Sequence, residues 1–149
     1  MRTGLSNMAE SETRLVGNTD EDLREWIRTN MVSERSTLLR DLRERAAKIL
    51  SLNDDGSIRP RPGVQLPARE LVLSAYIGRH YAVAAGLTTD PSIENKELGT
   101  TLSLPKGTIG RCLKELRDAR LIQAVTEGRH ILPLPNLDRA LQQVERSRT

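Results

Sequence analysis

The sequence predicts a mainly helical domain that carries one β-hairpin. Apolar residues recur every three or four positions along most of the chain, which is typical of helices that bury one face. From Leu121 the apolar residues alternate instead, and a Glu127-Gly128 pair interrupts the alternation, as in a hairpin. The length of 149 residues suits one domain with extensions. With one Trp, two Tyr and no Phe, the core must be aliphatic.

The first helix is expected to begin near Thr19. Residues 1–18 are polar and show no hydrophobic period, which is typical of a disordered tail. Thr19 is a good N-cap, and the acidic residues 20–22 suit the positive end of the helix dipole.

Residues 19–51 are expected to form a helical extension in two pieces. The apolar period is broken around residues 32–37, where Ser33 can cap the second piece. Between Asp20 and Leu50, seven basic residues balance seven acidic ones, as on a solvated helix face. Because the apolar stripe resembles an ordinary core face, we expect the extension to cover the core. A dimerisation or partner helix is the alternative.

A turn-rich connector, residues 52–67, leads to a buried helix. The connector contains Asp-Asp-Gly and Pro-Arg-Pro-Gly around two short extended pieces, residues 58–59 and 64–66. The next helix, residues 68–85, has apolar residues around most of its circumference, so it should be buried on more than one side. Gly86 follows it, at a position that favours a left-handed cap.

Two short helices joined by a tight turn follow. The first, residues 95–102, has Asn95 as a good N-cap. Pro105 then suits the first position of the second helix, residues 105–119, because its fixed φ is helical and its missing N–H costs nothing there.

The helix at residues 105–119 is amphipathic. Apolar residues three, four and seven apart form one stripe: Ile109, Cys112, Leu113 and Leu116. The outward face consists of Lys106, Gly107, Thr108, Gly110, Arg111, Lys114 and Arg117. A glycine inside a helix costs about 1 kcal/mol relative to alanine. Either the two glycines allow close approach to another surface, or the early turns of the helix tolerate them.

The chain ends with the hairpin and a last helix. Pro133 and Pro135 stop the second strand of the hairpin. Residues 135–149 are expected to form a helix capped by Asn136, followed by a polar tail. The narrow apolar stripe of this helix consists of Leu137, Ala140, Leu141 and Val144.

An apolar skeleton, a helical motif and a turn glycine together carry a family resemblance. The motif is Thr108-Ile109-Gly110-Arg111, the turn glycine is Gly128, and the skeleton consists of Leu98, Leu102, Ile109, Leu113, Leu116, Leu121 and Ile122. The chain resembles the winged helix-turn-helix superfamily over residues 68–134. The resemblance implies a three-helix core plus a β-hairpin wing, flanked here by an N-terminal helical extension and a C-terminal helix.

One position departs from the family pattern. The family usually has glycine where this chain has Arg120, because the residue that leaves the recognition helix tends to be left-handed. Either Arg120 tolerates this conformation, or the helix ends differently and the wing is tilted.

The resemblance implies DNA contacts from three elements. Lysine or arginine on an exposed helix can reach guanine O6 and N7 in the major groove, while helix starts and a wing contact phosphate. The candidate DNA-binding residues are Asn95, Lys96, Thr100, Lys106, Thr108, Arg111, Lys114 and Arg129. The predicted function is a sequence-specific double-stranded DNA-binding transcriptional regulator, a homodimer through its N- or C-terminal helix. The alternative is a winged-helix protein–protein interaction module in a DNA- or polymerase-associated assembly.

No catalytic, metal or cofactor site is expected. The sequence has no glycine-rich phosphate loop, no spaced Cys/His set and no nucleophile with a histidine in a plausible role. His80 is expected to be a partly exposed packing residue, and Cys112, the single cysteine, a buried one. The formal net charge of +3 favours a local basic patch over a basic protein. Without a bilayer-length apolar stretch or a signal peptide, we expect a cytoplasmic protein with no membrane partner.

Overall fold

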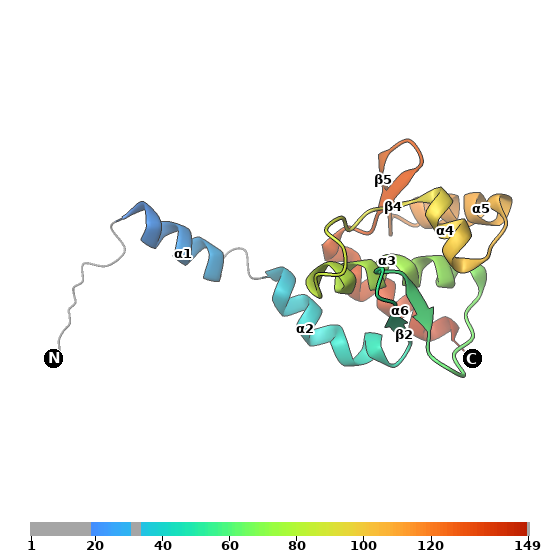
Figure 1. Cartoon of the computed structure of the whole chain (residues 1–149), viewed down its shortest axis with the longest axis horizontal. Helices are drawn as coiled ribbons and strands as arrows, with labels where there is room; N and C mark the ends of the chain where they lie inside the picture. Colours follow the sequence, from blue (N-terminus) through green and yellow to red (C-terminus); the bar gives the residue numbers. More distant parts are fainter. Residues whose placement is uncertain (1–18, 31–33, 149) are drawn as a thin grey trace. The chain divides into compact units, whose positions relative to one another are not determined.

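The computed structural model describes residues 19–30 and 34–148, which are mainly helical with small antiparallel sheets (Figure 1). The chain divides into two compact units, residues 1–38 and 39–149, and each is described by itself. The predicted N-terminal tail and the Ser33 cap lie outside the described residues.

In the first unit, helix α1 (Asp20–Asn30) begins where the sequence predicted. The Thr19 hydroxyl oxygen accepts a hydrogen bond of 3.0 Å from the Asp22 N–H, so the predicted N-cap is confirmed. The side chains of Leu23 and Trp26 on this helix are 54% and 58% exposed.

The second unit begins within helix α2 (Glu34–Ala47), whose Leu39, Leu42 and Ala46 are buried. These three residues belong to the hydrophobic core of the second unit. The extended piece predicted at residues 58–59 is present as β3 (Ile58–Pro60), but its antiparallel partner is β2 (Leu50–Leu52), which was not predicted. The extended piece predicted at residues 64–66 is not a strand.

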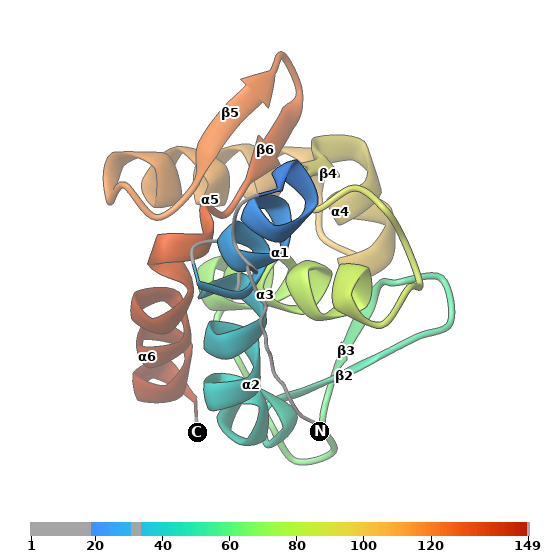
Figure 2. The ribbon, with the colours of Figure 1, turned by 90° about the vertical axis from the view of Figure 1, so that its left-hand side faces the viewer.

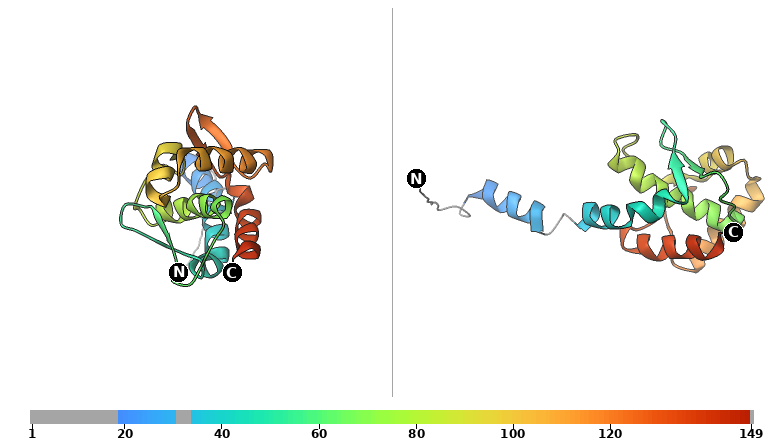
Figure 3. Two further views of the ribbon diagram at one scale, coloured as in Figure 1. Left: turned by 90° about the vertical axis from the view of Figure 1, so that its right-hand side faces the viewer. Right: turned by 90° about the horizontal axis from the view of Figure 1, so that it is seen from below.

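Helix α3 (Ala68–Ala84) is the centre of the second unit and contacts α4, α5, α6, β2 and β3. Figure 3 shows it between α5 and α6. Its apolar circumference explains this position, and Gly78 allows β3 to approach, because a Cβ there would lie 2.0 Å from Ile58 Cγ2. His80 is 4% exposed, and its Nε2 lies 2.7 Å from the Leu132 carbonyl oxygen. The prediction of a partly exposed His80 was therefore wrong.

Helix α3 ends as predicted. Gly86 has a φ of +77°, its N–H donates to the Val83 carbonyl, and the Leu87 N–H donates to the Ala82 carbonyl. This pair of bonds satisfies the last carbonyls of the helix.

Helices α4 (Asn95–Leu102) and α5 (Lys106–Asp118) are joined by a tight turn in which Ser103 has a φ of +56°. The predicted stripe of α5 is buried, including Cys112. Asn95 is the first helical residue and not the N-cap, which is Glu94, so the predicted cap was wrong.

The predicted hairpin is present as β5 (Gln123–Thr126) and β6 (Arg129–Ile131), and it projects beyond α5 (Figure 2). A third strand, β4 (Ile93–Glu94), pairs antiparallel with β6 and was not predicted. The order β4-β6-β5 attaches the hairpin to the start of α4, where the Asn95 N–H also donates to the Gly128 carbonyl.

After a short 3-10 helix, η1 (Leu134–Asn136), helix α6 (Leu137–Ser147) packs on α3. The predicted apolar stripe is fully buried within the chain. Asn136 is the N-cap residue, but its side-chain amide donates to the carbonyls of Arg120 and Leu121 and does not cap the helix. Arg45 of α2 makes salt bridges of 2.8 Å with Glu145 and 3.2 Å with Asp138, so α6 is also tied to α2.

Arg120 takes the left-handed conformation, with a φ of +61°. The Arg120 N–H donates to the Arg117 carbonyl and the Leu121 N–H to the Leu116 carbonyl, the same pair of bonds that closes α3 at Gly86. The helix therefore ends in the way usual for a glycine, although a side chain is present. Within the described residues, no helix has the length and apolar character needed to cross a membrane.

Candidate nucleic-acid interface

The exposed face of α5 carries most of the predicted cations. Lys106, Arg111 and Lys114 are exposed, whereas Thr108 is half-buried. Lys114 makes a salt bridge of 3.0 Å with Asp118, which offsets part of its charge. Across residues 19–30 and 34–148, no acidic side chain forms an ion pair with Lys106 or Arg111. These two charges are thus presented to solvent without a counter-ion among the described residues.

A groove of about 670 Å³ lies between the starts of α4 and α5 and the tip of the hairpin. It is lined by Asn95, Lys96, Thr100, Lys106, Gly110 and Gly128, together with Gly99 and Ile109, and by two acidic residues, Glu94 and Glu127. The structure therefore brings four of the predicted residues to one groove. Arg111 and Lys114 lie farther along α5, outside it.

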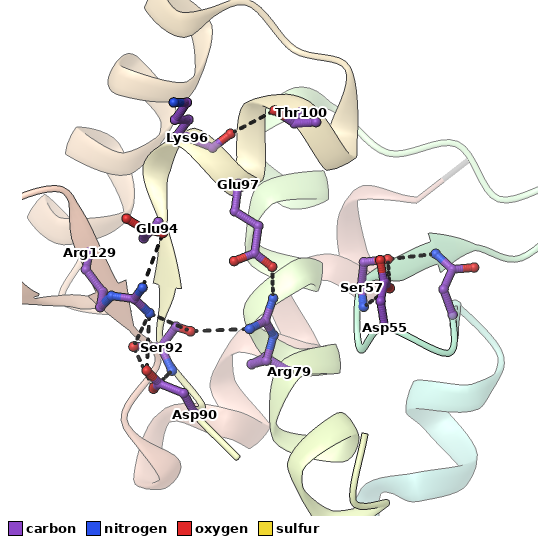
Figure 4. A network of polar contacts seen from close by, with 11 residues as sticks. Asp55, Ser57, Arg79, Asp90, Ser92, Glu94, Lys96, Glu97, Thr100 and Arg129 are labelled. Carbon is purple, nitrogen blue, oxygen red and sulfur yellow. Dashed lines mark hydrogen bonds and ion pairs between the residues drawn. The ribbon is translucent and has the colours of Figure 1, made fainter. Parts of the chain in front are cut away.

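Thr100 and Lys96, two of the predicted residues at this groove, differ in their contacts. Thr100 donates from its hydroxyl to the Lys96 carbonyl over 3.2 Å, as Figure 4 shows. Lys96 itself is exposed, and no ion pair to it occurs within the described part of the chain.

Arg129, the first residue of β6, is directed into a network with the segment before α4 (Figure 4). Its guanidinium lies 2.9 Å from Ser92 Oγ, 3.2 Å from Asp90 and 3.4 Å from Glu94. Hydrogen bonds from Ser92, with help from the charge of Arg129, lower the pKa of Asp90, so this carboxylate stays ionised. Arg129 holds β6 to the segment before α4, and two carboxylates there already offset its charge.

A second network joins the hairpin to both helices through His130. The ring is 4% exposed, with Nε2 3.0 Å from Arg117 Nη1 and Nδ1 3.0 Å from Asn95 Oδ1. Because a guanidinium can only donate, Nε2 must accept, and Nδ1 then donates to the Asn95 oxygen. Burial, reinforced by the charge of Arg117, lowers the pKa of His130, which agrees with this neutral form. Asn95 is therefore a structural partner of the hairpin.

The only sign of this role in the sequence is the alternation of His130 with Arg129 and Ile131, which places His130 on the inward side of the strand. Arg79 was also missed. It is buried on α3 and pairs with Glu97, so it fixes α4 against the core.

The two glycines on the outward face of α5 have open space where a side chain would begin. A Cβ built on Gly107 or on Gly110 meets no heavy atom within 4 Å, whereas one on Gly99 meets the Leu104 carbonyl oxygen at 3.5 Å. Gly107 lies in the first turn of α5, but Gly110 lies in its interior, where glycine costs about 1 kcal/mol relative to alanine.

The described residues contain no group of three His, Cys, Asp or Glu that could hold a metal ion. Comparison of the chain with models of protein families, with curated proteins and with solved structures found no match.

Proposed function

We propose that residues 68–134 form a winged helix-turn-helix unit that binds double-stranded DNA with α5 in the major groove, as a sequence-specific regulator of transcription. The order α3, α4, α5 and then the β5–β6 hairpin supports the assignment of the unit. The observation that carries the functional proposal is the exposed face of α5, where Lys106 and Arg111 have no counter-ion in the part of the chain that the structure describes.

The residues divide into contacting and supporting groups. Arg111 is suited to a bidentate contact with guanine, because its guanidinium has several fixed donors. Lys96 and Lys106, on the helix side of the groove, are suited to phosphate. Arg129 and Asn95 are assigned to the support of the hairpin, since both are bonded inside the chain.

A duplex-binding experiment tests the proposal. The full chain is used to select duplexes from a random-sequence pool, and the affinity for the selected duplex is measured at two salt concentrations. Replacing both Lys106 and Arg111 with Ala should weaken binding at least tenfold and lower the slope of log affinity against log salt by about 2. Lys114→Ala should have a smaller effect because Asp118 already pairs with it.

The matched control removes two charges elsewhere. Arg40 and Lys48 are exposed and lie on or just after the C-terminal part of α2. Changing both to Ala removes the same net charge and should leave the affinity within about twofold. A wild-type chain that enriches no duplex, or equal losses in the two double variants, would contradict the proposal.

A second candidate function is a protein–protein interaction module in a DNA- or polymerase-associated assembly. The exposed Leu23 and Trp26 on α1 favour it, because large apolar side chains on a surface helix are typical of protein contacts. Purification of the full chain from its native cells separates the two functions. A stable complex with a DNA- or polymerase-associated protein, lost when Leu23 becomes Ser, together with no duplex affinity of the chain alone, would favour the second.

A further inference from the structure

We propose that one sugar–phosphate strand of the bound duplex runs through the groove between α4, α5 and the hairpin tip, and that Gly110 is its point of closest approach. This inference rests on the proposed DNA-binding function. It adds a steric requirement for duplex binding to the charged contacts: position 110 must have no side chain.

No contact within the described residues explains why position 110 is a glycine. Gly78 and Gly99 lie in helices too, but a Cβ on Gly78 would overlap Ile58, and one on Gly99 would contact Leu104 and Ile109. A Cβ on Gly110 meets nothing, although the residue lies within α5 and lines the groove. Glycine weakens a helix, and no packing contact within the described chain requires it at this position. Such a glycine is suited to the close approach of another backbone.

The chemistry of the groove favours a nucleic-acid strand over an apolar peptide. Besides its glycines, the lining has one apolar side chain, Ile109, and its charged side chains include two lysines. Helices α4 and α5 carry the ammonium groups of Lys96 and Lys106. Glu127 lies at the hairpin tip, and Glu94, at the start of α4, is paired with Arg129. A polyanionic strand would therefore lie against the helix side, which is where Gly110 is.

The test compares two alanine substitutions in the full chain. Gly110→Ala should raise the melting temperature by about 3 °C, because alanine favours the helix and the new methyl group meets no protein atom. The same variant should bind the duplex selected by the wild type about tenfold more weakly, because the methyl group displaces the strand. Gly110→Leu should weaken binding further.

Gly107→Ala is the matched control. It also adds a methyl group in open space on α5, but Gly107 does not line the groove. Its affinity should fall less than that of Gly110→Ala, because Gly107 is on the exposed face of α5 but outside the groove. Only Gly110→Ala is expected to combine a higher melting temperature with a loss of affinity of about tenfold.

Three results would overturn the inference while leaving the proposed function intact. These are unchanged affinity of Gly110→Ala, equal losses for the Gly107 and Gly110 variants, or a lower melting temperature for Gly110→Ala. A wild-type chain that binds no duplex overturns the proposed function and this inference with it.

Discussion

Helices α3 and α5 both carry residues that are unusual in a helix, but only those of α3 are explained inside the chain. In α3, Gly78 accommodates Ile58, and the buried Arg79 pairs with Glu97. In α5, Gly110 faces open space and Arg111 has no ion pair with any described acidic residue. On a helix that is buried on several sides, an unusual residue is explained by packing within the chain. On a helix with one open face, it points to something outside the chain.

The largest effect that tests this comparison is expected at Gly78. Gly78→Ala should lower the free energy of unfolding by about 2 kcal/mol, because the overlap with Ile58 exceeds the gain in helix propensity. Urea denaturation measures it, and Gly110→Ala is the matched substitution that should raise the same quantity.

A double variant shows whether Ile58 is the cause. In an Ile58→Ala background the β-branched methyl group is gone, so Gly78→Ala should cost nothing further. If the two substitutions add, the explanation of Gly78 by this contact is wrong.

Residues that contact the covered side of α5 should contribute to stability, as Gly78 and Arg79 of α3 do. His130 tests this expectation. His130→Ala removes hydrogen-bond partners from Arg117 and Asn95 and should cost about 1.5 kcal/mol at neutral pH. Circular dichroism during urea titration measures the loss.

The same residue predicts a pH dependence. Because the pKa of His130 is lowered in the folded chain, the unfolded chain binds more protons below about pH 6.5, and stability must fall as the pH is lowered from there. The charge of Arg117 opposes the protonated ring, and Asn95, the other partner, does not titrate. Between about pH 7.5 and pH 5.5 the wild type should lose stability that His130→Ala does not lose. Equal pH dependence in both proteins would exclude His130 as the source.

The helices were predictable because their apolar periods are long. Residues 68–85 and 105–119 were predicted as helices, and α3 and α5 begin and end within one residue of those bounds. Strand β4 was not predictable, because two residues carry no period. In the candidate interface, the exposure of the α5 cations could be predicted from the position of the apolar stripe. The bonds of Arg129 to Asp90 and Ser92 could not be predicted, because these partners come from a separate segment that the fold brings close.

The end of α5 offers a smaller test. Arg120→Gly should stabilise the fold by about 1 kcal/mol, because a left-handed residue with a side chain is strained. Gly86→Ala at the equivalent position of α3 should destabilise by a similar amount. Thermal melts of the two variants should therefore shift in opposite directions. A drop in stability for Arg120→Gly would mean that the arginine side chain has a stabilising role of its own.

The smallest effect is expected at Glu127, which lines the groove at the hairpin tip. If the duplex strand lies against Lys96 and Lys106, the carboxylate at the hairpin tip repels it across the groove without touching it. Glu127→Gln should then raise duplex affinity about twofold, roughly 0.5 kcal/mol, and the gain should shrink at high salt, where exposed charges are screened. Asp54→Asn, in the exposed turn between β2 and β3, removes the same charge away from α5 and should have no effect. Weaker binding by Glu127→Gln would instead place the carboxylate in direct contact with a donor on the DNA, which would move the strand to the hairpin side and away from Gly110.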